Sequence, residues 1–99
     1  MAVAVIVELR NKDMYETLTE AMFGTKQAPA VDGCLIHTMG EGPKGYRVVD
    51  VWESREAFDR FMNDQLMPAA QEAGMNDTSG PQPEIVELEH VVMNEAVRV

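Results

Sequence analysis

The chain has a single cysteine, Cys34, so it cannot form a disulfide within itself. Cationic side chains are also few: 8 lysines and arginines stand against 17 aspartates and glutamates, which gives a formal net charge of −9. A surface this acidic repels phosphate backbones and anionic lipid head groups, so we expect neither nucleic acid nor a membrane as a partner. A lone cysteine is typical of reducing compartments and predicts a cytoplasmic location.

Long hydrophobic runs are missing as well. The apolar N-terminal stretch is too short to cross a bilayer, and it lacks the basic start and small-residue cleavage site of a secretory signal, so we interpret it as a strand. No phosphate-binding loop, dinucleotide fingerprint or nucleophile motif is present. With 99 residues the chain is long enough for one core, which predicts a single domain over residues 1–99.

Hydrophobic periodicity predicts the element order β-α-β-β-α-β. Short connections and right-handed crossovers then favour a ferredoxin-like α+β fold, a four-stranded antiparallel sheet with both helices on one face. The other face would stay uncovered, and a second copy of the chain is its simplest cover, so we expect a homodimer paired through its sheet faces. The strands are predicted at residues 2–9, 33–40, 46–53 and 84–94, and the helices at residues 13–23 and 55–73.

Each predicted helix has recognisable end signals. Asp13 with Glu16 resembles a capping box at the start of the first helix, and Ser54 is a good N-cap for the second. Pro68 lies inside the second helix, where its ring would clash with a carbonyl and predicts a kink or break. Met14, Leu18, Ala21 and Met22 form the apolar stripe that we expect to face the core from the first helix.

A hairpin with a loop at residues 42–45 fixes a strand register. One face of this hairpin would hold Ile36, Thr38, Val49 and Val51, and we expect this face to lie under the helices. The register places His37 opposite Asp50, Leu35 opposite Trp52, and Met39 opposite Val48.

His37 and Asp50 are the candidate catalytic residues. A carboxylate beside an imidazole favours its protonated form and fixes its tautomer, which leaves the second ring nitrogen to act as acid or base near neutral pH. The same pair could instead be a structural hydrogen bond, and the sequence leaves both interpretations open.

Four further residues are candidates for substrate binding. Trp52 could stack on a planar ligand or fill the core, and Met39 would share the face of His37. Tyr15 could line the mouth of a cavity or lie on the surface, and His90 could face the cavity or the dimer seam. The two histidines lack a clear third ligand, so we expect no metal site.

Residues 48–58, with the sequence VVDVWESREAF, are followed by Phe61 and Leu66. This stretch resembles the third-strand-to-second-helix segment of the antibiotic biosynthesis monooxygenase-like superfamily. The resemblance implies a dimeric α+β barrel with a pocket between the sheet and helices of each subunit. It also implies a range of activities, from cofactor-independent quinone-forming monooxygenases to related cyclases and isomerases.

Heme-degrading members of this superfamily carry an axial histidine after an Ala-Ala pair on the second helix. Here Gln71 follows Ala69 and Ala70, and Phe61 stands where those members have a distorting tryptophan. The resemblance therefore does not extend to heme, and we expect no cofactor.

Two functional hypotheses follow. In the first, the chain is a cofactor-independent monooxygenase, or a related cyclase or isomerase, acting on a planar aromatic or polyketide-like substrate. In the second, it is a non-catalytic module that binds a ligand or assembles. The sequence does not decide whether the protein is an enzyme.

Overall fold

A four-stranded antiparallel sheet forms the centre of the fold in a computed structural model that describes residues 1–74 and 83–93. The strand order β2-β3-β1-β4 is consistent with a ferredoxin-like fold. Strand β1 lies between β3 and β4, which explains why its sequence is apolar on both faces. The elements are β1 (Val3–Leu9), α1 (Lys12–Phe23), β2 (Cys34–Gly42), β3 (Gly45–Trp52), α2 (Arg55–Phe61), η1 (Met62–Leu66), α3 (Met67–Glu72) and β4 (Glu84–Glu87).

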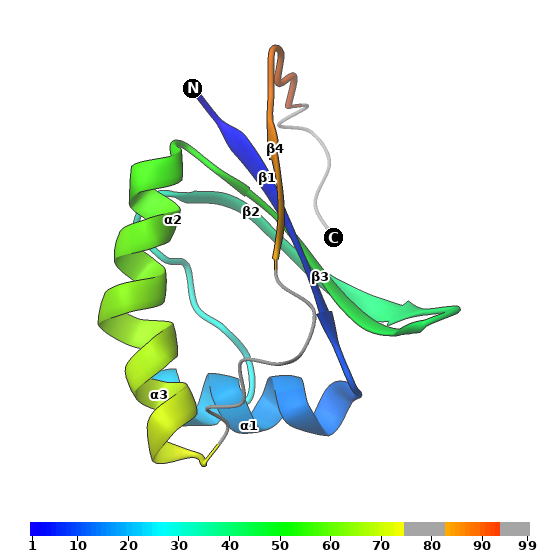
Figure 1. The fold of residues 1–99 in the computed structure, drawn as a ribbon, viewed down its shortest axis with the longest axis vertical. Coiled ribbons are helices and arrows are strands. Elements are labelled where there is room, and N and C mark those ends of the chain that lie inside the picture. Colours follow the sequence, from blue (N-terminus) through cyan, green and yellow to red (C-terminus); the bar gives the residue numbers. More distant parts are fainter. Residues whose placement is uncertain (75–82, 94–99) are drawn as a thin grey trace.

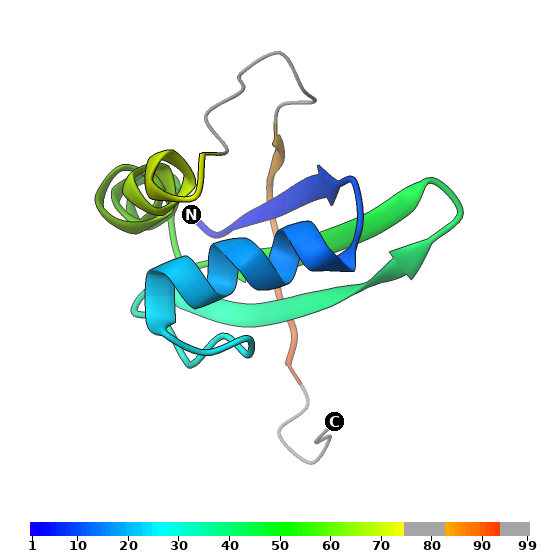
Figure 2. The same ribbon diagram turned by 90° about the horizontal axis from the view of Figure 1, so that it is seen from below.

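Both helical segments pack on the same face of the sheet (Figures 1 and 2). One core cluster joins Trp52 of β3 to Phe58 of α2 and to the valines of β1. A second cluster joins Tyr15 of α1 to Tyr46 and Val48 of β3. The two helices therefore cover different ends of one sheet face.

The covered face is the opposite of the one predicted. The side chains of Trp52, Val48 and Asp50 point toward the helices, whereas Val49, at 38% exposure, lies on the open face. Both sets of residues are apolar enough to be buried, so the alternation alone did not identify the inner face. The bulky Trp52 side chain, 1% exposed, is what the helices cover.

Helix α1 begins at Lys12, so its N-cap lies two residues before Asp13, the N-cap that the predicted capping box implied. Asn11 is the N-cap, and its side chain accepts a hydrogen bond of 2.9 Å from the Met14 amide. The fully buried positions on α1 are Tyr15 and Thr19. Of the predicted stripe, Met14, Leu18 and Met22 are half-buried and Ala21 is exposed. Gly24 ends the helix in a left-handed conformation, with φ of 73°, as its position predicted.

Pro68 does not break the second helix. The backbone instead widens into the π-helical turn η1, in which the Met67 amide donates to the Met62 carbonyl, and α3 continues from there (Figure 1). A wide turn accommodates a proline that cannot donate a hydrogen bond and whose ring crowds the preceding turn. Ser54 caps α2 as predicted, since its hydroxyl accepts from the Ala57 amide at 3.1 Å.

The β2–β3 register agrees with the prediction at three pairs and differs at one. His37 lies opposite Asp50, Met39 opposite Val48, and Glu41 opposite Tyr46. Trp52, however, pairs with Cys34 rather than with Leu35, because a bulge interrupts the register between Cys34 and Ile36. The extra residue changes which side chains at the start of β2 face the helices.

Strand β4 is shorter than predicted and ends at Glu87. One further backbone bond follows, from the Leu88 amide to the Ala2 carbonyl at 2.9 Å. His90 therefore lies beyond the strand, and the last residue of the predicted strand, Asn94, is outside the described residues. Among the residues described here, no helix has the length and apolar character needed to cross a membrane.

Candidate functional site

A cavity of about 280 Å³ lies between the helices and the inner face of the sheet. Its wall is mostly apolar, and a small group of polar side chains interrupts it on one side. The polar group consists of Tyr15, Thr19, His37 and Asp50. The apolar wall includes Leu18, Met22, Phe23, Val31, Leu35, Val48, Trp52, Phe58, Phe61, Met62 and Leu66.

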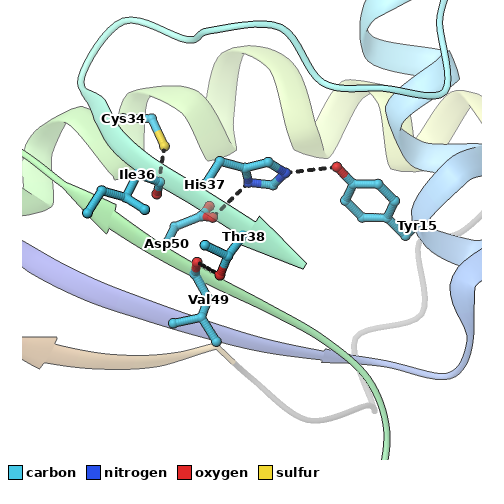
Figure 3. A network of polar contacts seen from close by, with 7 residues as sticks. All are labelled: Tyr15, Cys34, Ile36, His37, Thr38, Val49 and Asp50. Atoms are coloured by element: carbon cyan, nitrogen blue, oxygen red, sulfur yellow. Dashed lines mark hydrogen bonds and ion pairs between the residues drawn. The ribbon is translucent and has the colours of Figure 1, made fainter. Parts of the chain in front are cut away.

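His37 and Asp50 are in contact, as their predicted register required. The imidazole Nδ1 lies 2.7 Å from the Asp50 Oδ1 atom (Figure 3). The Asp50 side chain is 12% exposed and that of His37 is 31% exposed, so the carboxylate forms the inner end of the pair. A carboxylate can only accept, which assigns a proton to Nδ1 and fixes the imidazole tautomer.

Tyr15 completes a chain of three side chains that the sequence did not predict as a unit. Its hydroxyl lies 2.8 Å from the Nε2 atom of His37, and its ring stacks on the imidazole at a centroid distance of 6.0 Å and an angle of 18° (Figure 3). Helix α1, β2 and β3 each contribute one member of the chain. Tyr15 is 6% exposed, so of the two predicted locations it occupies the cavity wall rather than the surface.

The surroundings of Tyr15 and His37 raise the pKa of both side chains. The hydrogen bond that His37 donates to Asp50 raises the pKa of His37 above its usual value, although burial acts in the opposite direction. Burial raises the pKa of Tyr15 and keeps its phenol protonated. Of the three hydrogen-bonded side chains, the imidazole is therefore the one that can accept and release a proton near neutral pH.

Trp52 lines the cavity from β3 and packs edge-on against Phe58, with ring centroids 5.6 Å apart. A second aromatic contact, with Phe61, has a centroid distance of 5.1 Å. Its indole Nε1–H is buried and has no hydrogen-bond partner among the described residues. The side chain thus belongs to both the core and the cavity wall, which the sequence had offered as alternatives.

Cys34 also reaches the cavity, but its surroundings disfavour a reactive thiolate. Burial, followed by the charge of Asp50, raises the pKa of the thiol to about 11. Its Sγ atom donates to the Ile36 carbonyl at 3.4 Å. A thiol with this pKa is almost entirely protonated at neutral pH and is a weak nucleophile.

The remaining candidates lie outside the cavity wall. Met39 is 44% exposed near the hairpin end of β2. His90 is exposed, beyond the end of β4. Tyr46, which its place beside a turn suggested to be exposed, is buried at 9% and packs against Tyr15 with ring centroids 5.8 Å apart.

The chain was compared with models of protein families, with curated proteins and with solved structures, and none of the three comparisons found a match.

Proposed function

We propose that this protein binds a planar aromatic or polyketide-like small molecule in the cavity and oxidises it as a cofactor-independent monooxygenase. The proposal rests on the hydrogen-bonded chain of Asp50, His37 and Tyr15 in the wall of an otherwise apolar cavity. An apolar cavity with a few convergent polar groups suits a flat, weakly polar ligand. The resemblance of residues 48–58 to antibiotic biosynthesis monooxygenase-like proteins supports the same class of activity. We place the protein in the cytoplasm because it has a single cysteine.

The proposed chemistry begins with removal of a proton. His37 is the final acceptor of a proton released by the substrate hydroxyl or by an acidic ring carbon, and Asp50 stabilises the imidazolium that forms. The substrate anion then reduces dioxygen, which is the oxidant. One oxygen atom replaces the hydrogens of a ring CH₂ group to give a carbonyl, and the other oxygen atom leaves as water. An apolar wall excludes bulk water from the anion while this occurs.

The direct test is a screen of phenols, anthrone-like ketones and hydroquinones with an oxygen electrode and mass analysis of the products. We expect oxygen uptake matched by a product that has gained one oxygen atom and lost two hydrogens. Uptake should be unaffected by chelators added to the purified protein. Tight binding of a screened compound without oxygen uptake or isomerisation would reject the catalytic proposal.

A second function is favoured by one observation: each nitrogen of His37 already has a protein partner. A closed hydrogen-bond chain also suits a structural role, in which the cavity holds a ligand without converting it. In that case a ligand should remain bound through purification, and native mass spectrometry should detect its mass unchanged after incubation in air.

The open sheet face supports a homodimer. Its apolar residues include Val49 and Val86, which are 38% and 41% exposed, and Ile6 lies on β1, between the strands that carry them. An ion pair between Arg47 and Glu8, 2.7 Å long, crosses the same face. A second copy laid on this face would bury the apolar residues and form the proposed α+β barrel.

Substituting Val49→Asp should disrupt this dimer, because it places a charge at the centre of the proposed seam. We expect native mass spectrometry at micromolar concentration to give a dimer for the wild-type protein and a monomer for the variant. The control is Met67→Asp, since Met67 is 47% exposed on the helical side of the molecule. A wild-type monomer, or an intact Val49→Asp dimer, would reject the pairing.

A further inference from the structure

Both ring nitrogens of His37 are engaged, and this determines which atom a ligand can reach. Asp50 accepts from Nδ1–H at 2.7 Å, so the Nε2 atom of a neutral imidazole carries no proton. That nitrogen then accepts from the Tyr15 hydroxyl at 2.8 Å. Its one lone pair is used, and a ligand hydroxyl that enters the cavity finds no free acceptor on His37.

The Tyr15 oxygen, by contrast, keeps an acceptor site. A phenol hydroxyl has one proton to donate and two lone pairs. The proton is used in the bond to His37, and a hydrogen bond with the Thr19 side chain uses one lone pair, which leaves the other lone pair as an acceptor. Tyr15 lines the cavity together with Thr19, which lies one turn further along α1 and is 2% exposed. A ligand hydroxyl therefore meets the hydrogen-bonded chain first at the phenol oxygen.

We infer that Tyr15 is a proton shuttle between a hydroxyl-bearing planar ligand, a phenol or an enol, and His37. The inference rests on the proposed function, since it requires that such a ligand occupies the cavity. The ligand O–H bond breaks and its proton binds the Tyr15 oxygen, while the original Tyr15 proton moves to the Nε2 atom of His37. The products are a ligand anion, a neutral Tyr15 and an imidazolium hydrogen-bonded to Asp50.

The surroundings of the three residues agree with these roles. Burial raises the pKa of Tyr15, which disfavours a lasting tyrosinate but not a transfer in which the phenol loses one proton as it gains another. The bond to Asp50 raises the pKa of His37, which makes the imidazole a good place to store the proton. The competing role is that Tyr15 only orients the imidazole through their stacked rings.

The Tyr15→Phe variant separates the two roles, because it keeps the stacked ring and removes only the hydroxyl. The probe is 4-nitrophenol, whose anion is recognised by its visible absorption. If Tyr15 is the shuttle, the wild-type protein should bind the probe largely as the anion near neutral pH. In Tyr15→Phe the ratio of ionised to neutral bound probe should fall by at least about tenfold, equivalent to one pKa unit.

The other outcomes have distinct meanings. An unchanged or larger ionised fraction in Tyr15→Phe would show that a freed Nε2 takes the proton directly, which would overturn the shuttle while leaving the proposed binding site intact. Wild-type binding of the neutral phenol alone would also overturn it. No binding of the probe or of any screened phenol would reject the proposed function and, with it, this inference.

Tyr46→Phe is the matched control, since Tyr46 is the other tyrosine of the chain and lies outside the cavity wall. Its substitution should leave the ionised fraction unchanged. A second measurement does not depend on the folding of Tyr15→Phe: 3-fluorotyrosine incorporated into Tyr46→Phe labels position 15 alone. We expect its ¹⁹F resonance to shift when the probe binds, and an unmoved resonance would contradict contact between Tyr15 and the ligand.

Discussion

Replacing Trp52 with alanine is expected to lower the free energy of unfolding by about 3–5 kcal/mol, the usual cost of removing a large aromatic side chain from a core. Trp52 is 1% exposed and contacts Phe58 and Phe61, so its loss leaves a void that joins the existing cavity. The free energy of unfolding of a small domain is about 5–15 kcal/mol. The substitution should therefore remove a large part of the stability.

The measurement is urea denaturation followed by far-ultraviolet circular dichroism, because Trp52 is the only tryptophan and its fluorescence disappears in the variant. Protein concentration must be held constant, since dimerisation would add to the apparent stability. Met67→Ala is the control: its side chain is 47% exposed and its removal should cost no more than about 0.5 kcal/mol. Equal costs for the two variants would contradict the assignment of Trp52 to the core.

Trp52→Phe refines the same prediction. The indole Nε1–H is buried without a hydrogen-bond partner among the described residues, so its removal sacrifices no hydrogen bond that they make. Only the volume of the second ring is lost. We therefore expect Trp52→Phe to cost clearly less than Trp52→Ala, and a cost as large as that of alanine would indicate a partner for the indole N–H.

The hairpin register could be predicted from sequence because a glycine-rich turn fixes it. Once the loop at residues 42–45 is located, counting backwards places His37 opposite Asp50, and the structure confirms this pair, with Gly42 and Gly45 also paired. The count fails at Leu35, where the bulge inserts an extra residue. A bulge has no compositional signal here, so the pairing of Trp52 could be established only from the folded backbone.

The buried side of α1 could not be predicted from apolar residues alone. Two residues of its predicted apolar stripe, Leu18 and Met22, line the cavity, but the fully buried positions are Tyr15 and Thr19. They are buried because they face the polar part of the cavity, where Tyr15 meets His37. That partner lies 22 residues away in sequence, and helical periodicity contains no information about it.

The inner face of the sheet posed a similar difficulty. Both faces of β1 and β3 carry apolar residues, so alternation does not say which face the helices cover. The helices cover the face that carries Trp52, one of the largest fully buried side chains. The face that the helices leave open still carries exposed apolar residues, and it is the face on which we propose that a second copy packs.

Replacing His37 with glutamine should lower the turnover of an accepted substrate by about 10²–10⁴-fold, the range measured for removing a general base. Glutamine keeps polar atoms near Tyr15 and Asp50 but cannot take up a proton, so the fold should be retained while proton transfer is lost. Oxygen uptake under saturating substrate measures the effect. Full activity in a folded His37→Gln variant would exclude His37 from the mechanism.

The pH dependence of the proposed activity in the wild-type protein should report the same residue. The base must be neutral, so activity should rise with pH through the pKa of His37, which Asp50 holds above its ordinary value near 6.5. The sign follows from the cause: a favoured imidazolium requires a higher pH before the neutral base is present. His90→Gln leaves His37 as the only imidazole, so its titration can be followed by NMR in that background.

Asp50→Asn then separates the two contributions of the carboxylate. Removing its charge should lower the pKa of His37, so the rise in activity should move to lower pH. The maximal rate should nevertheless fall, because an amide no longer enforces the tautomer with a proton on Nδ1 or stabilises the imidazolium. A lower maximum with an unmoved midpoint would indicate that Asp50 only positions the ring, whereas a moved midpoint with an undiminished maximum would show that neither the tautomer nor the imidazolium depends on Asp50.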